Sequence, residues 1–187
     1  MKPALILSST AAPGITLESI TSEHLELLRL WKNNHSHRFF HQEKITATQQ
    51  REWFDAYSTR PGDWIFLIHD PATKHPAGCL GYRVLDKEID IYNVLRAENV
   101  PSRSRAHSHA LNILTNHIAA THQLPIRARV LADNPAARWA RLHGFQPIGR
   151  GHEAGLEFHF LEQDPLRRAA YPVTVKWTSD CANQNPL

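Results

Sequence analysis

One short segment, residues 133–145, carries a marker for each end of a helix and has strand-like sequence on both sides. Asn134 can cap the helix N-terminus through its side-chain oxygen, and Pro135 suits the first helical position. Gly144 can adopt the left-handed conformation that closes a helix C-terminus. The segment therefore predicts a strand, a short helix and a second strand in close succession. Such a unit favours a fold in which helices pack on a sheet.

The rest of the chain has the periodicities of alternating strands and helices. The order predicts a single α+β domain over residues 14–162, with a mixed, mostly antiparallel sheet of about seven strands flanked by four helices. Residues 163–187 read as a C-terminal tail with one candidate edge strand over 171–177 and disorder beyond it. The expected strands cover 14–20, 64–69, 78–85, 88–95, 126–132, a stretch from 145, and 155–162. The expected helices begin near residues 22, 46, 105 and 135.

The charge balance limits the classes of partner. The 187-residue chain has a net charge of +3 and a sequence pI near 9.0, which suits an anionic ligand but is too mild to indicate nucleic acid. No apolar run approaches the roughly 20 residues of a membrane span, and the opening apolar run is too short for a secretory signal. The two cysteines, Cys79 and Cys181, agree with a reducing compartment. We therefore expect a cytoplasmic protein with no nucleic-acid or membrane partner.

Thirteen histidines raise the question of a metal. Two His-Ser-His triplets, at 35–37 and 107–109, have no cysteine or carboxylate partner at a familiar ligand spacing. We expect no bound metal.

The helix expected after Arg105 begins with a candidate anion site. A helix N-terminus presents free N–H groups and the positive end of the helix dipole. Arg96 and Arg103 precede this helix and add positive charge. A solvated basic helix start is the alternative interpretation of the same residues.

Three motifs together resemble the GCN5-related N-acetyltransferase (GNAT) family. The unit at 133–145 resembles the closing module of that family. The run 105–110 (Arg-Ala-His-Ser-His-Ala) resembles the Arg/Gln-x-x-Gly-x-Gly/Ala cofactor motif, with Ser108 in place of its middle glycine. The run 31–34 (Trp-Lys-Asn-Asn), followed by residues 38–40 and 45–53, resembles a pattern found in the branch that acetylates ribosomal-protein N-termini and nucleotide-linked amino sugars. The resemblance spans about residues 14–162.

The resemblance implies a GNAT-like fold with acetyl-CoA as the acyl donor and no metal. In that fold two strands splay apart, and a backbone N–H of Val94 or Leu95 would bind the thioester carbonyl. Asn134 would bond the pantetheine arm in addition to capping its helix, and Arg138 would either meet CoA phosphates or lie on a solvated face. The expected cofactor-binding residues are Val94, Leu95, Arg96, Arg103, Arg105, Ala106, His107, Ser108, His109, Ala110, Asn134 and Arg138.

The implied reaction is direct attack of a primary amine on the thioester. Glu88 or Asp90 would accept the amine proton, directly or through water, and either Tyr92 or solvent would protonate the leaving thiolate. These three side chains alternate along one strand, so an exposed polar face of a hairpin is their alternative role.

The same resemblance implies an acceptor pocket lined by four side chains, although Trp31 and Phe40 could equally be ordinary core. The four are Trp31, Phe40, His41 and Tyr82. We expect a small-molecule acceptor such as an amino sugar or a nucleotide-linked amino sugar. A protein or peptide N-terminus and a non-catalytic GNAT-fold module with a degenerate CoA site remain the alternatives, and a homodimer is compatible with each of them.

Overall fold

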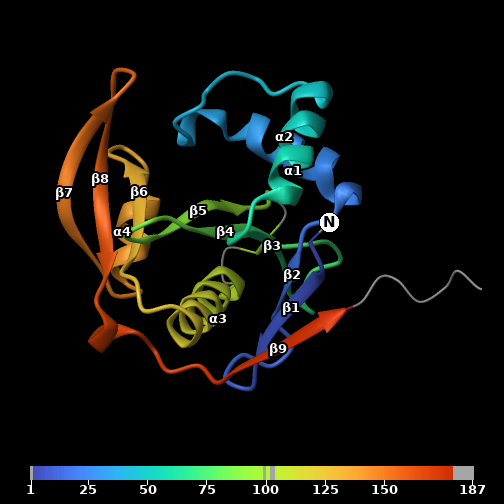
Figure 1. Cartoon of the computed structure of the whole chain (residues 1–187), viewed down its shortest axis with the longest axis vertical. Helices are drawn as coiled ribbons and strands as arrows, with labels where there is room; N and C mark the ends of the chain where they lie inside the picture. The colour runs from blue at the N-terminus through green and yellow to red at the C-terminus, as the bar shows by residue number, and fades with distance from the viewer. Residues whose placement is uncertain (1, 99, 102–103, 179–187) are drawn as a thin grey trace, which may run out of the picture.

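Apolar residues alternate along the central strands and cover both faces of one sheet. Phe66 and Ile68 belong to the core beneath the long helix α3, whereas Ile65 and Leu67 belong to a second core beneath α1 and α2. The computed structural model describes residues 2–98, 100–101 and 104–178. Within these residues the chain has three layers, with helices on both faces of the sheet (Figure 1).

The described residues form nine strands in the order β7-β8-β6-β5-β4-β3-β2-β1-β9, and four α-helices. The strands are β1 (Ala4–Ser9), β2 (Thr16–Ser19), β3 (Asp63–His69), β4 (Gly78–Val84), β5 (Ile89–Arg96), β6 (Ile126–Leu131), β7 (Phe145–Glu153), β8 (Leu156–Gln163) and β9 (Val173–Thr178). The helices are α1 (Leu25–Asn34), α2 (Ala47–Thr59), α3 (Ala106–Thr121) and α4 (Ala136–Arg141), with short 3-10 turns η1 (Ser22–His24), η2 (Ser36–Arg38) and η3 (Pro165–Arg167).

The sheet has two strands more than expected, because both chain ends add to one edge. β1 pairs antiparallel with β9 along its whole length, from Ala4 opposite Thr178 to Ser9 opposite Val173. Leu5 and Leu7 of β1 alternate into the core and are almost fully buried. The candidate strand in the tail is therefore the edge strand β9. The expected disorder beyond it, and Cys181, lie outside the described residues.

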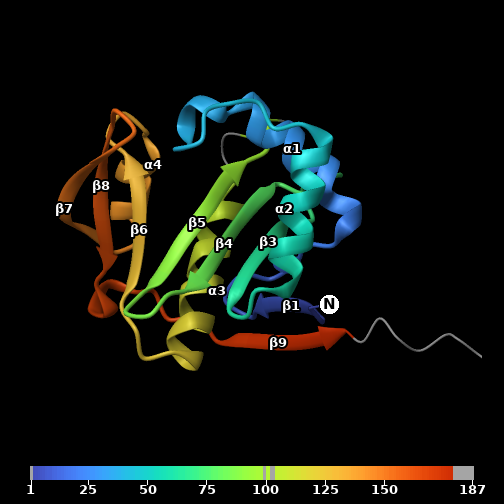
Figure 2. The ribbon, with the colours of Figure 1, turned by 45° about the horizontal axis from the view of Figure 1, so that its top comes forward.

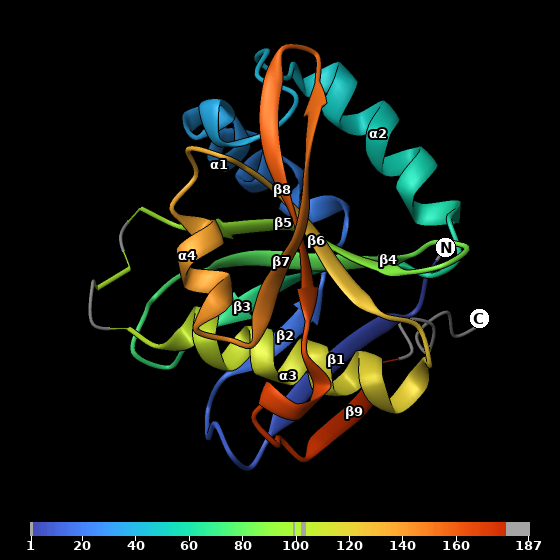
Figure 3. The same ribbon diagram turned by 90° about the vertical axis from the view of Figure 1, so that its left-hand side faces the viewer.

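The expected strand–short helix–strand unit is present, with its start shifted by one residue. Pro135 rather than Asn134 is the N-cap residue of α4. Asn134 still serves the first turn, since its Oδ1 accepts a hydrogen bond of 2.9 Å from the Ala136 amide. α4 ends at Arg141 with Leu142 as its C-cap. Gly144, two residues further on, has the predicted left-handed φ, at 84°, and leads the chain into the β7–β8 hairpin (Figure 3).

The strands β5 and β6 form a parallel pair joined by α3, and they separate soon after they begin. Their register contains only three pairs, from Ile89 opposite Ile126 to Ile91 opposite Ala128. Beyond Ile91, β5 runs on to Arg96, and β6 runs on to Leu131 with β8 as its partner. Figure 2 shows the two strands close together at their starts and apart at their ends.

No helix in the described part of the chain is both long enough and apolar enough to cross a membrane.

Candidate active site

A cavity of about 330 Å³ lies where β5 and β6 part. We call it the wedge cavity. Its walls are residues 91–94 of β5, residues 128–131 of β6 and the inner face of α4, with Asn134 and Trp139 among them. A long thin ligand could therefore pass between the two strands.

A β-bulge in β5 lies at the centre of this region. Between the pairs Cys79–Leu95 and Gly81–Tyr92, β5 has one residue more than β4, and Asn93 has a φ of 50°. A bulge leaves its extra residue outside the ladder and re-aims the neighbouring groups. The Cys79 thiol donates to the Asn93 carbonyl oxygen at 3.3 Å, and burial raises the pKa of that thiol to about 12. The thiol thus stays protonated and helps to hold the bulge.

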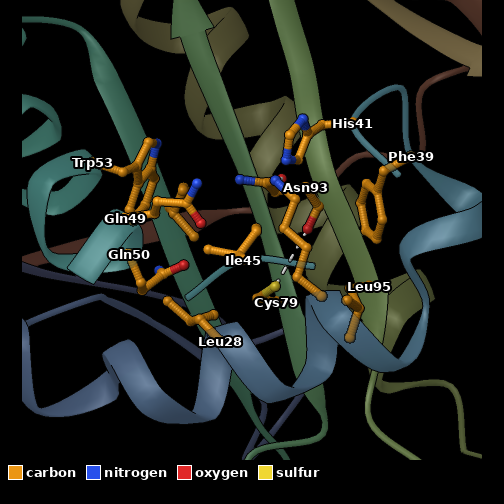
Figure 4. A pocket seen from close by; sticks show the side chains of 12 residues that line it. Leu28, Phe39, His41, Ile45, Gln49, Gln50, Trp53, Cys79, Asn93 and Leu95 are labelled. Atoms are coloured by element: carbon orange, nitrogen blue, oxygen red, sulfur yellow. Dashed lines mark hydrogen bonds between the residues drawn. The ribbon is translucent and has the colours of Figure 1, made fainter. Parts of the chain in front are cut away.

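A second cavity of about 300 Å³ adjoins the first on the side of α1 and α2. We call it the acceptor cavity. Figure 4 shows Trp53, Gln49 and Gln50 from α2 on one side, and Phe39 and His41 from the loop after α1 on the other. The two cavities share five lining residues and are therefore neighbouring parts of one site. The shared residues are Lys32, Phe39, His41, Trp53 and Asn93.

The loop over residues 35–46 is held near its end and at its middle. Near α1, Asn33 Oδ1 accepts from the Ile45 amide at 2.8 Å, and Asn33 Nδ2 donates to the Ile45 carbonyl at 2.9 Å. On the far side, the ring of Phe40 packs edge-on against Phe158 of β8, with 5.2 Å between ring centroids. The loop therefore reaches from α1 to the strands beyond the wedge cavity.

The start of α3 has amides available for an anion. The Ala106 amide donates to Ser104 Oγ at 3.1 Å, but the amides of His107 and Ser108 have no acceptor among the described residues. The hydroxyl of Ser108 shares a 3.1 Å hydrogen bond with His143 Nε2, which joins this first turn to the residues after α4. Within the described residues, the first turn of α3 thus offers backbone donors although the middle glycine of the family motif is missing.

The three predicted catalytic side chains do not form one cluster. Glu88 lies outside both cavities and pairs with Arg127 at 2.8 Å. Asp90 lines the wedge cavity but is buried and paired with Arg83 at 2.7 Å; burial raises its pKa, and Arg83 opposes that rise. Tyr92 also lines the wedge cavity, yet its hydroxyl donates to Asp63.

Burial and this carboxylate raise the pKa of Tyr92, which makes the phenol a firm hydrogen-bond donor to Asp63. The hydroxyl is therefore committed to a structural contact rather than presented to a ligand.

Two of the four predicted acceptor-pocket residues belong to the core instead. Trp31 packs in the apolar cluster beneath α1, and Tyr82 stacks with Phe66 beneath α3. Neither lines the two cavities. Phe40 and His41 do line the wedge cavity, and His41 lines the acceptor cavity as well.

The predicted cofactor residues divide into three groups. Val94 and Asn134 line the wedge cavity, whereas Leu95 lines the acceptor cavity.

The side chains at the start of α3 are hydrogen-bonded within the protein or buried. His107 Nε2 bonds the Leu95 carbonyl at 3.1 Å, and His109 bonds Tyr171 at 2.8 Å. Ala106 and Ala110 are core residues. Of the arginines, Arg96 donates to the carbonyls of Val100 and Pro101, Arg105 and Arg138 are exposed, and Arg103 lies outside the described residues.

Lys32 and Asn93 lie where the two cavities meet, and neither was predicted as a site residue. Lys32 Nζ donates to Asn93 Oδ1 at 3.3 Å, across 61 positions of sequence. The one available signal was a lysine in the Trp-Lys-Asn-Asn run of an otherwise apolar helix face. The bulge at Asn93 left no such signal.

Among the residues that the structure describes, no three His, Cys, Asp or Glu side chains lie together as a metal site would require.

Comparison with known proteins points to one fold. No protein-family model and no curated protein sequence matches this chain. The solved structure of apo FdhC, a nucleotide-linked sugar GNAT, matches with a TM-score of 0.68 at 13% identity, over 83% of this chain and 89% of FdhC. RimL, a ribosomal L7/L12 alpha-N-protein acetyltransferase, matches with 0.66 at 15% identity, over 84% and 94%.

The third structure is spermidine N-acetyltransferase from Vibrio cholerae in complex with CoA and spermine, with a TM-score of 0.67 at 15% identity, over 80% of this chain and 94% of that one. All three cover most of both chains. The fold of this chain is therefore that of the GNAT acetyltransferases.

Proposed function

We propose that the protein is an N-acetyltransferase that moves an acetyl group from acetyl-CoA to a primary amine. The observation that carries the proposal is the early parting of β5 and β6, with one cavity between the strands and a second cavity beside it. A thioester arm would occupy the wedge cavity, and the amine would occupy the acceptor cavity. The two would meet at Asn93, which lines both.

Groups of this chain suit the chemistry of CoA. The amides of His107 and Ser108 at the start of α3 would donate to the diphosphate, with Arg96 and Arg105 nearby in the chain to supply charge. A backbone N–H of Val94 or Leu95, beside the bulge, would donate to the thioester carbonyl oxygen and stabilise the charge that develops on it. Asn134, which lines the wedge cavity, would bond the amide groups of the pantetheine arm.

The amine nitrogen attacks the carbonyl carbon, the C–N bond forms, and the C–S bond then breaks to release the CoA thiolate. The amine loses one proton, and the thiolate gains one. His41 is the candidate proton acceptor, because it is exposed and lines both cavities, and histidine is the commonest general base. The pairing of Glu88 with Arg127 and of Asp90 with Arg83 makes both carboxylates weaker candidates.

Calorimetric titration with acetyl-CoA, followed by a free-thiol assay against a panel of amines, tests the proposal. We expect micromolar binding with one CoA per chain and thiol release that depends on the amine. No heat and no thermal shift at millimolar acetyl-CoA would instead identify a non-catalytic module that keeps the fold.

A further inference from the structure

The described residues that line the acceptor cavity include a positively charged side chain but no negatively charged one. Among its described lining residues, none is Asp or Glu, and the polar members are Lys32, His41, Gln49, Gln50 and Asn93. The rest of the lining is apolar or a thiol, with Trp53, Phe39 and Leu28 prominent in Figure 4. A polyamine or another polycation would find no carboxylate there to balance its charge.

Lys32 is the lysine that lines this cavity, and its ammonium group has few partners among the described residues. Its ammonium donates to Asn93 Oδ1 at 3.3 Å and lies 5.2 Å from the centroid of the Phe39 ring. No carboxylate among the described residues forms an ion pair with it. An ammonium group has three donors, so this one has donors to spare for a ligand.

The surroundings of Lys32 make an anionic ligand group favourable. Burial lowers the pKa of the lysine below its usual value, and the charge of Arg83 acts in the same direction. Both effects penalise an isolated ammonium, and an opposite charge nearby would relieve the penalty. A cation in the same place would be repelled.

We propose that the amine accepted by this protein also bears an anionic group, a carboxylate or a phosphate, which pairs with Lys32 in the acceptor cavity. This inference rests on the proposed acetyltransferase function. A volume of about 300 Å³ limits the acceptor to a small molecule. Contacts with Trp53 and Phe39 would hold its apolar part, and its amine would point toward the bulge at Asn93.

Matched pairs of acceptors test the charge requirement. One pair, methionine and methioninamide, tests a carboxylate. The other pair, glucosamine 6-phosphate and glucosamine, tests a phosphate. Spermine represents the polycations. We expect the anionic member of at least one pair to have a kcat/KM at least about tenfold above the partner that lacks the anionic group, mainly through KM, since a charge-assisted hydrogen bond supplies that much. The pair that shows the difference identifies which group, carboxylate or phosphate, the protein recognises.

Variants of Lys32 separate recognition from mere folding. Lys32→Gln should reduce the ratio within the responding pair to about one, and Lys32→Arg should restore most of it. Lys87→Gln, at an exposed turn between β4 and β5, is the matched control and should leave the ratio unchanged. If Lys32→Gln unfolds, the Lys32→Arg variant and the wild-type ratios still decide the question.

The outcomes distinguish the two proposals. Failure of acetyl-CoA to bind the wild-type protein overturns the acetyltransferase proposal itself. Binding of acetyl-CoA together with equal or better use of the members without an anionic group, or of spermine, overturns only the anionic acceptor. Failure of both anionic members to bind the CoA-loaded protein, measured by calorimetry, has the same consequence.

Discussion

Ile91 of β5 lies opposite Ala128 of β6 in the last residue pair that the two parallel strands share. Both side chains line the wedge cavity, which opens directly beyond them. The bulge at Asn93 follows two residues later, so the strand loses its regular pleat where its neighbour departs. The loss of pairing and the irregular backbone thus occur together, and both favour a ligand between the strands.

Ala128→Leu should block this opening, because the larger side chain projects into the cavity. We expect acetyl-CoA to bind at least about tenfold more weakly, a change of about 1.4 kcal/mol. Overpacking should lower the free energy of unfolding by about 1–3 kcal/mol. Calorimetry well below the unfolding midpoint measures the affinity, and Ala132→Leu, at an exposed position just after β6, is the control. Unchanged affinity in the folded Ala128→Leu protein would show that the thioester arm does not pass between the strands.

Asn33→Ala should loosen the loop that carries Phe39 and His41. It removes two hydrogen bonds to Ile45, each worth about 1 kcal/mol of stability. We expect the KM of the acceptor to rise more than the dissociation constant of acetyl-CoA, because the loop lines the acceptor cavity. Steady-state kinetics and calorimetry give the two numbers. Asn34→Ala, at an exposed neighbour, should change neither, and equal changes in both numbers would contradict a selective role of the loop.

Tyr92→Phe should act on stability rather than on chemistry. The change leaves the buried carboxylate of Asp63 without its phenol donor, and an unpaired buried polar group costs about 1–3 kcal/mol. Denaturant unfolding should show this loss, while kcat at saturating substrates stays within about threefold of wild type. A drop of kcat of about a hundredfold in folded protein would return Tyr92 to the role of proton donor.

Local signals predicted those parts of the fold that local contacts determine. The helix expected near residue 46 begins at a capping box, with the Gln49 amide 3.2 Å from Thr46 Oγ1 and the Thr46 amide 2.9 Å from Gln49 Oε1. Gly144 has the expected left-handed conformation, two residues after Leu142, the C-cap of α4. The pairing of β1 with β9 escaped prediction because it joins the two ends of the chain. The short run that holds Leu5 and Leu7 shows its strand character only beside that distant partner.

The site residues show the same contrast between local signals and distant contacts. The resemblance led to Val94, Asn134 and His41, which do line the cavities. Lys32 and Asn93 were missed because their importance arises from a contact across 61 positions and from a bulge, neither of which has a periodic signature. Trp31 and Tyr82 lie in the core clusters. The sequence could not show this, because an aromatic side chain in a helix or strand looks alike in sequence whether it faces a pocket or a core.

Stability should fall in mild acid through buried histidines, of which His117 is the clearest. Burial and the charge of His122 lower the pKa of His117 from 6.5, so below about pH 6.5 the unfolded chain binds a proton that the folded protein does not. This stabilisation is complete above that pH and is lost as the pH falls toward the folded-state pKa, by at most about 1.4 kcal/mol per pH unit. The raised pKa of Asp90 has the opposite effect, in the range just above pH 3.8.

Denaturant unfolding at pH 7 and 5.5 in wild type and His117→Gln measures the contribution of His117. The His117→Gln variant should lose less stability than wild type between pH 7 and pH 5.5. His152→Gln, at an exposed position, controls for the replacement of a histidine by glutamine. An unchanged difference between the two pH values would exclude His117 as a source of the acid sensitivity.

Asn134 serves two partners at once, and two substitutions separate them. Its Oδ1 accepts from the Ala136 amide at 2.9 Å at the start of α4, and its Nδ2 donates to the Arg38 carbonyl at 3.2 Å. Asn134→Asp keeps the acceptor and removes the donor, whereas Asn134→Ala removes both. Loss of a capping contact costs about 0.5–2 kcal/mol, so the alanine variant should be less stable than the aspartate variant by about that amount.

If Asn134 also donates to the pantetheine arm, both variants should bind acetyl-CoA at least about tenfold more weakly than wild type. Asp133→Ala, at the exposed neighbouring position, controls for a change beside α4 and should bind normally. Thermal unfolding and calorimetry on the same samples measure stability and affinity independently. Normal affinity in the aspartate variant would confine Asn134 to the helix start, since the only group that this variant lacks is the amide donor that a pantetheine carbonyl would need.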